Sequence, residues 1–140
     1  MYTNIINKEM FIVTNCICGE NSVSRNVYAC SGCADLGEVA DQVSRQLRKE
    51  GFAQSSMSCI AGIAAHMKPF IDAAKKVEEV IVIDGCQVVC GKKVMEHAEI
   101  TAVSYVLTDM GLTKGKTEVT SDVINDICNK IKERAKSNTK

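Results

Sequence analysis

Cysteine is the residue type in this chain that is best suited to chemistry, because 8 of the 140 residues carry a thiol. In a reducing compartment, thiols stay free for metal binding or redox chemistry instead of forming structural disulfides. Four thiolates placed tetrahedrally at about 2.3 Å form a set that zinc binds, and a closed set of this kind is usually structural. The cysteine count therefore predicts a metal-binding or redox protein, and the elements that carry the cysteines decide which of them meet.

The elements that position these thiols follow from the hydrophobic pattern, which alternates from Asn26 onward between short extended runs and runs with helical spacing. This alternation is typical of βαβ units and a parallel sheet. We therefore predict a single three-layer α/β domain, Rossmann-like, with a mostly parallel sheet of four to five strands and helices on both faces. The predicted strands are 27–29, 56–60, 80–83 and 103–107, with 11–13 as a fifth at the edge, and the predicted helices are 36–47, 69–77, 89–98 and 121–135.

Three cysteines follow predicted strands, and a fourth lies one helical turn beyond them. Cys30 comes after the first strand, Cys59 ends the second, and Cys86 follows the third after the turn at Asp84. The carboxyl ends of parallel strands meet at one sheet edge, where ligands bind in open α/β folds. Cys90, four residues after Cys86, lies on the same helix face. Helix N-termini also favour thiolates over thiols, so the sheet edge predicts a zinc site of four cysteines.

Three segments of the chain resemble motifs of the DGC-domain family, which is named for an Asp-Gly-Cys turn and to which zinc binding is ascribed. They are 29–32 (ACSG), 59–63 (CIAGI) and 81–90 (IVIDGCQVVC), and the resemblance covers about residues 26–116. It implies the same four metal ligands, Cys30, Cys59, Cys86 and Cys90. We accordingly expect an N-terminal arm with a Cys-x-Cys at 1–25, a DGC-type α/β metal-binding domain at 26–136, and a frayed tail at 137–140.

The chain departs from the family pattern at three positions. Gln87 stands where a proline is expected, Glu99 where a glycine is expected, and Cys33 where a small residue is expected. Cys33 matters most, because Cys30 and Cys33 form a C-x-x-C unit at a strand-to-helix turn. The alternative to a zinc protein is therefore a thiol-disulfide or iron-sulfur redox protein that uses Cys30 and Cys33.

The other cysteines have separate interpretations. Cys16 and Cys18 form a pair in the arm that folds over the cluster or adds ligands to it, an alternative that the sequence leaves open. Cys128 shares one helix face with isoleucines and is interpreted as a core residue.

Three further polar residues lie near the predicted site. Asp84 is interpreted as a turn residue that caps the following helix. Asp35 and Glu38 form a capping arrangement at the first predicted helix. His66 stands near the second turn and is interpreted as a polar loop residue.

Several function classes are disfavoured by composition and motif. Lys and Arg balance Asp and Glu at 17 each, so nucleic acid is not an expected partner. The chain lacks a secretory signal pattern and an apolar run long enough for a membrane span, so we expect a cytoplasmic protein without membrane association. None of the three strand-end cysteines begins a C-x₅-R phosphatase loop, and the first turn matches no nucleotide-binding motif. The expected partner is a metal ion, and no reaction or protein partner is assigned.

Overall fold

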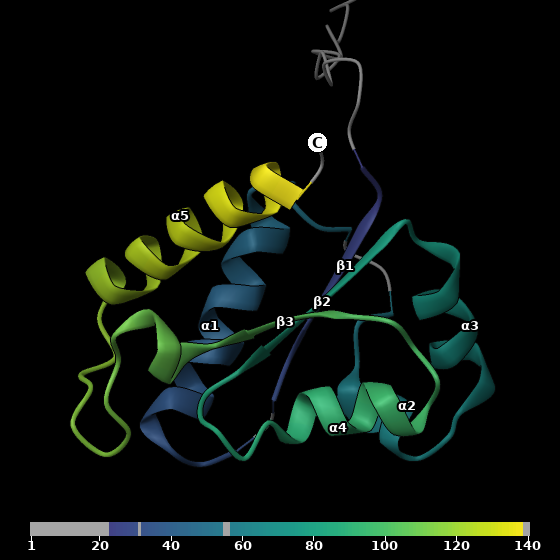
Figure 1. The fold of residues 1–140 in the computed structure, drawn as a ribbon, viewed down its shortest axis with the longest axis horizontal. Helices are drawn as coiled ribbons and strands as arrows, with labels where there is room; N and C mark the ends of the chain where they lie inside the picture. Colours follow the sequence, from purple (N-terminus) through teal and green to yellow (C-terminus); the bar gives the residue numbers. More distant parts are fainter. Residues whose placement is uncertain (1–22, 31, 55–56, 139–140) are drawn as a thin grey trace, which may run out of the picture.

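The computed structural model describes residues 23–30, 32–54 and 57–138 of the chain (Figure 1). Strands and helices follow one another along the chain, but three described helices stand between β1 and β2, where the hydrophobic pattern predicts a strand between two helices. The elements in chain order are β1 (Arg25–Ala29), α1 (Asp35–Lys49), α2 (Ile60–Ala64), α3 (Lys68–Lys76), β2 (Glu79–Asp84), α4 (Cys90–His97), β3 (Val103–Val106), the 3₁₀ helix η1 (Leu107–Met110) and α5 (Ser121–Asn138). None of the described helices is both long and apolar enough to cross a membrane.

The sheet is parallel and has the strand order β1-β2-β3. Val27 pairs with Ile81, and Ile83 pairs with Tyr105, so β2 lies between the other two strands. Residues 80–83 of β2 are fully buried, which fits an apolar central strand that is covered on both faces. Because the strands are parallel, their carboxyl ends lie at one edge of the sheet.

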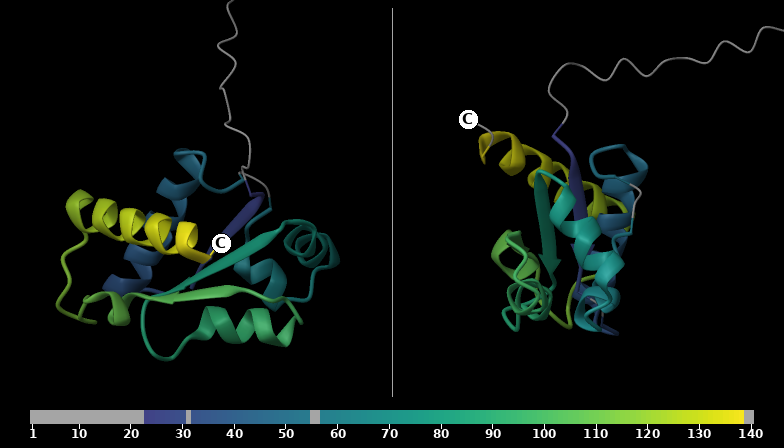
Figure 2. Two further views of the ribbon diagram at one scale, coloured as in Figure 1. Left: turned by 45° about the horizontal axis from the view of Figure 1, so that its top comes forward. Right: turned by 90° about the vertical axis from the view of Figure 1, so that its right-hand side faces the viewer.

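Helices cover both faces of the sheet and form two separate hydrophobic clusters. One cluster joins Val27, Ile81 and Ile83 of the sheet to α1 and α5, and α5 packs across α1 (Figures 1 and 2). The other joins Tyr28 and Val82 to α2, α3 and α4. The prediction of an α/β domain with a parallel sheet and helices on both faces is confirmed.

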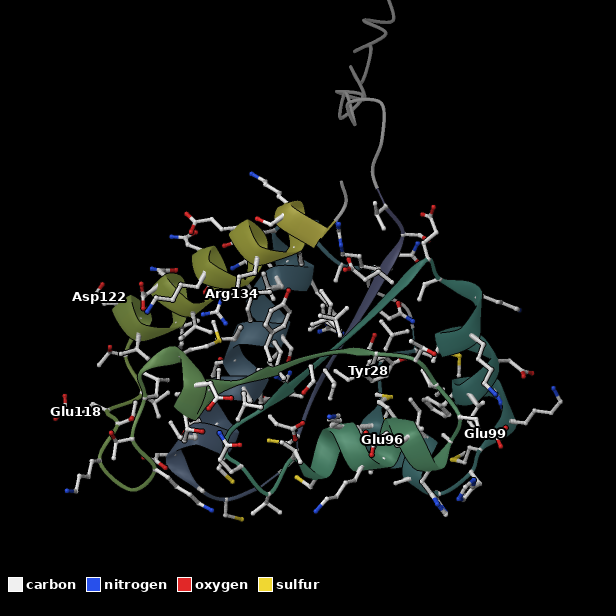
Figure 3. All side chains as sticks on the ribbon, viewed as in Figure 1. Tyr28, Glu96, Glu99, Glu118, Asp122 and Arg134 are labelled. Carbon is white, nitrogen blue, oxygen red and sulfur yellow. The ribbon has the colours of Figure 1, made fainter. Side chains whose placement is uncertain are left out.

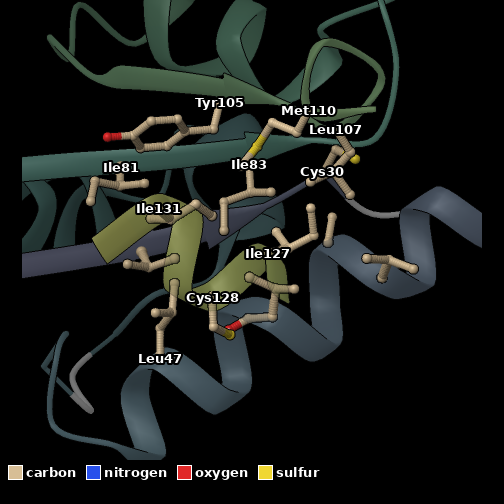
Figure 4. Close-up of a cluster of buried hydrophobic side chains, with 14 of the residues drawn as sticks. Cys30, Leu47, Ile81, Ile83, Tyr105, Leu107, Met110, Ile127, Cys128 and Ile131 are labelled. Atoms are coloured by element: carbon tan, nitrogen blue, oxygen red, sulfur yellow. The ribbon is translucent and has the colours of Figure 1, made fainter. Parts of the chain in front are cut away.

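Cys128 lies inside the first cluster, where it is 1% exposed (Figure 4). Its thiol lies 3.7 Å from the carbonyl oxygen of Val43 in α1. The interpretation of Cys128 as a core residue is confirmed.

The described part of the sheet has three strands, where the sequence predicts four to five. The prediction of a strand at 56–60 is wrong: residues 57–59 form no strand, and Ile60 begins α2. The apolar run after Cys59 forms the helix α2, which packs against α3. Glycine at position 62 permits this close packing, because a Cβ there would lie only 2.6 Å from the ring of Phe70. The predicted fifth strand at 11–13 lies outside the described residues.

Among the described residues before α2, Gln54 contacts the first strand through its backbone. The N–H of Gln54 donates to the carbonyl of Arg25 at 2.8 Å, at the start of β1. At the other end of the domain, α5 extends to Asn138, two residues into the predicted tail.

Candidate metal centre

The site lies where β1 and β2 end, and Cys30 forms its buried part. The N–H of Cys30 donates to the carbonyl of Ile83 at 2.9 Å, which adds one bond to the pairing of β1 with β2. The thiol of Cys30 accepts the N–H of Gly85 at 3.2 Å, and the side chain is 8% exposed. A Cβ at Gly85 would lie 2.9 Å from the backbone of Leu36. Glycine therefore lets the turn after β2 lie against the first turn of α1.

Asp84 ends β2 and holds the first turn of α4. Its carboxylate, 1% exposed, accepts the N–H of Gly91 at 2.7 Å and the N–H of Lys92 at 2.9 Å. A negative charge at a helix N-terminus satisfies free donors and complements the helix dipole. A Cβ at Gly91 would lie 2.8 Å from Val82 and 2.9 Å from Asp84, so glycine is needed for this close approach. The interpretation of Asp84 as the cap of the following helix is confirmed.

These two arrangements bring Cys30, Asp84 and Cys90 together. Their sulfur and oxygen atoms all lie within 4.8 Å of one another, and the Cys90 sulfur lies 3.8 Å from Asp84 Oδ1. Cys30 and Asp84 are buried, whereas Cys90, the first residue of α4, is exposed. The cluster therefore has two buried donors and opens to solvent at Cys90. Thiolates and a carboxylate are donors that zinc accepts.

The electrostatics of Cys30 differ from the sequence-based expectation of a thiolate. Burial raises the pKa of Cys30 to about 11, the N–H of Gly85 opposes this change, and the neighbouring Cys90 and Asp84 raise the pKa further. Burial therefore outweighs the donors at this edge of the sheet. Without a cation, Cys30 is a neutral thiol at neutral pH, and a bound metal would have to displace its proton.

Among the described residues, neither Cys59 nor Cys86 belongs to this group of donors. Cys59 is the exposed residue that precedes α2, and it lines a cavity of about 560 Å³ together with Cys30. Cys86 is partly buried in the turn before α4, and the amino group of Lys114 lies 3.6 Å from its sulfur. The structure thus brings together two of the four predicted ligands, Cys30 and Cys90.

The remaining sequence candidates do not join the cluster within the described part of the chain. Cys33 is exposed and is not part of the group that contains Cys30. Cys16 and Cys18 lie outside the described residues. The ring of His66 lies against that of His97, which ends α4, whereas Cys90 begins this helix.

Hydrogen bonds also tie the loops around the site to one another, and sequence reasoning missed these contacts. Asp35 accepts the N–H of Gly115 at 2.8 Å and the N–H of Thr117 at 3.1 Å. Its predicted capping role at α1 is wrong, because Ala34 precedes the helix without a side-chain cap.

Gln87 makes a second tie between the loops. Its side-chain amide donates to the hydroxyl of Thr108 at 3.2 Å and to the carboxylate of Asp109. The only sequence signal for this contact is that Gln87 replaces the proline expected from the family pattern.

Comparisons with known proteins agree with the motifs. A family model described as the DGC domain matches residues 26–131. A protein of Pseudomonas aeruginosa, strain PAO1, named anaerobic and virulence modulator AnvM, is 30% identical over 89 residues. The aligned region covers 63% of this chain and 66% of that protein, which is less than two thirds of its length. No solved structure matches the chain.

Proposed function

The chain belongs to the DGC domain family, and on this premise we propose that it is a zinc-binding protein whose cysteines hold the ion at the carboxyl edge of the sheet. One observation carries the proposal: Cys30, Asp84 and Cys90 place their donor atoms within 4.8 Å of one another. The three residues come from the end of β1, the end of β2 and the start of α4. A set of donors gathered from separate elements is typical of a binding site.

The proposed ligands are Cys30 and Cys90, completed by Cys59 and Cys86. Support for the last two comes from the cavity that Cys59 shares with Cys30 and from the position of Cys86 between Gly85 and α4. Asp84 acts as a positioning residue in this proposal, because two backbone N–H groups already bind its carboxylate. It fixes the first turn of α4 and therefore the place of Cys90.

The chemistry of the donors supports zinc as the ion. Thiolates select zinc, copper(I) and iron-sulfur clusters over oxygen-preferring cations. Zinc would supply the positive charge that makes a thiolate of buried Cys30 favourable. We place the protein in the cytoplasm, where reducing conditions keep thiols available. The relative from Pseudomonas aeruginosa is named as a modulator, which assigns it no reaction, and we propose none for this chain.

The test is elemental analysis together with a visible absorption spectrum of the native protein. We expect one zinc per chain and no visible band. Cys30→Ser and Cys90→Ser should each abolish stoichiometric zinc, and Cys59→Ser and Cys86→Ser should weaken its retention against a chelator. Cys128→Ala is the matched control, since this thiol packs between α5 and α1 and is not one of the donors gathered at the site, and it should keep its zinc.

Two outcomes would reject parts of this proposal. A brown protein that contains iron and sulfide would replace zinc by an iron-sulfur cluster. A metal-free protein with a reversible disulfide between Cys30 and Cys33 would instead support the redox alternative, and Cys33→Ser would then remove that disulfide.

A further inference from the structure

The chain has two histidines, and the fold brings them into contact at the surface. His66 follows α2 and His97 is the last residue of α4. Their ring centres lie 5.0 Å apart with an angle of 71° between the ring planes, and both side chains are exposed. Two residues far apart in the sequence therefore present imidazoles side by side to solvent.

Buried neighbours fix the backbone on each side of this pair. Ile63 of α2 and Met95 of α4 belong to one hydrophobic cluster, and Ala98 is buried in it directly after His97. The histidine pair is thus carried by packed elements and not by free loops. Since the rings themselves are exposed, this packing does not require an imidazole at either position.

The backbone of His66 adopts the left-handed region, where histidine is found more often than most residues other than glycine. Its φ is 53°, in the left-handed region, where a residue other than glycine costs about 1–2 kcal/mol. Glycine and asparagine are the usual residues at such helix ends. The N–H of His66 donates to the carbonyl of Ile63 at 2.9 Å, so the turn is well formed. From this turn, the ring of His66 lies against the ring of His97.

The spacing of the two rings suits a shared metal ion. With metal–nitrogen bonds of about 2.0–2.1 Å, two imidazoles on one ion hold their ring centres roughly 5 Å apart. The carboxyl end of α4 carries partial negative charge that favours a cation. Glu99, which is exposed, follows this end of α4, whereas Glu96 of α4 is paired with Lys92 (Figure 3).

We propose that His66 and His97 form a second metal site, for a borderline divalent cation such as Zn²⁺, Ni²⁺ or Cu²⁺, with water in the remaining coordination positions. Imidazole suits these ions, whereas magnesium and calcium prefer oxygen ligands. The site lies at the end of α4 opposite Cys90, and the eight-residue helix separates the two ends by about 10 Å. Two exposed nitrogen ligands make a labile site, independent of the cysteine centre.

The experiment adds Ni²⁺ to the protein as isolated and follows the histidine ring protons by NMR. These are the ring signals of two histidines alone, so assignment is direct. We expect the paramagnetic ion to broaden both histidines together, at concentrations that leave other surface residues sharp. His66→Asn keeps a residue that tolerates the left-handed backbone, and it should weaken the broadening of His97 at least tenfold. His97→Gln should have the same effect on His66.

Lys93→Ala is the matched control, because Lys93 is exposed on α4 and is not a metal ligand. It should leave the broadening of both histidines unchanged. Ring signals that stay sharp while Ni²⁺ binds elsewhere would overturn the proposal. So would single variants whose remaining histidine broadens as in the parent, since the two residues would then not share an ion. If His66→Asn does not fold, His97→Gln alone decides the question, because it leaves His66 in place.

Discussion

At the scale of single residues, burial raises the pKa of two cysteines that have different surroundings. Burial raises the pKa of Cys128 to about 11, as it does for Cys30. Cys128 lies among isoleucines of α5 against α1 (Figure 4). Cys30 borders the same hydrophobic cluster, but it also lies beside Cys90 and Asp84. Cys30 therefore has donors beside it that a metal ion can share, and Cys128 has an apolar surrounding that makes ionisation costly.

The buried thiol of Cys128 predicts a loss of stability at alkaline pH. A pKa that folding raises contributes stability below the unfolded pKa of about 9, and this contribution is lost as pH rises towards 11. The change amounts to about 2–3 kcal/mol in the free energy of unfolding. Urea unfolding of parent and Cys128→Ala between pH 8 and about 11 measures it. The variant should show a flatter pH dependence; equal slopes would mean that Cys128 ionises without cost.

Sequence reasoning was sound at this scale for residues whose role follows from local pattern. Cys128 could be placed in the core from its helical spacing, and Asp84 could be identified as a cap from its position before a helix. Asp35 could not, because the N–H groups that it binds belong to Gly115 and Thr117, which lie far along the chain. The contact of His66 with His97 was missed for the same reason, since no local pattern encodes a meeting of two helix ends.

At the scale of elements, the three parallel strands and their order along the chain could be predicted from the sequence. The predicted strand at 56–60 was wrong, because Ile60 begins a helix. The run 80–83 is apolar on both faces, which only a covered central strand explains. The run after Cys59 is too short for its period to separate strand from helix. The choice was made by packing, because Gly62 lets α2 approach Phe70 of α3. This difference also explains why the position of Cys59 relative to Cys30 was harder to predict than that of Cys90.

The contact of α4 with β2 predicts that Gly91→Ala disrupts the site. The new Cβ would lie 2.8 Å from the Val82 side chain and 2.9 Å from the Asp84 carboxylate, so either these buried side chains or the first turn of α4, which carries Cys90, must shift. We expect a loss of about 1–3 kcal/mol in the free energy of unfolding and weaker zinc retention. Gly32→Ala is the matched control near Cys30, because no atom lies within 4 Å of its Cβ position. Equal behaviour of the two variants would show that α4 does not depend on this close approach.

At the scale of the whole molecule, hydrogen bonds join segments around the carboxyl edge of the sheet. Asp35 at the start of α1 binds the loop before α5, and Gln87 before α4 binds η1. Lys114, in the loop before α5, approaches the sulfur of Cys86. Because β1, β2 and β3 all end at this edge, these contacts link the segments that follow each strand. Loss of one of these contacts should therefore loosen a loop that is distant in the sequence.

The bond between Asp35 and the loop before α5 gives the last prediction. The N–H groups of Gly115 and Thr117, of which Gly115 contributes most, hold the pKa of the Asp35 carboxyl below its usual value of 3.8. A lowered pKa means that the carboxylate contributes stability above the unfolded pKa and loses this contribution as pH falls through the folded value. Asp35→Ala should therefore speed hydrogen exchange at Gly115 and Thr117 at neutral pH. In the parent, the protection factors of these two amides, which correct for slower intrinsic exchange in acid, should fall once the pH drops below the folded pKa of Asp35. Asp122→Ala, an exposed change in the first turn of α5, should leave both amides protected. If Asp35→Ala leaves exchange at these two amides unchanged, the loop is held by other contacts, and Lys114 does not depend on Asp35 for its place beside Cys86.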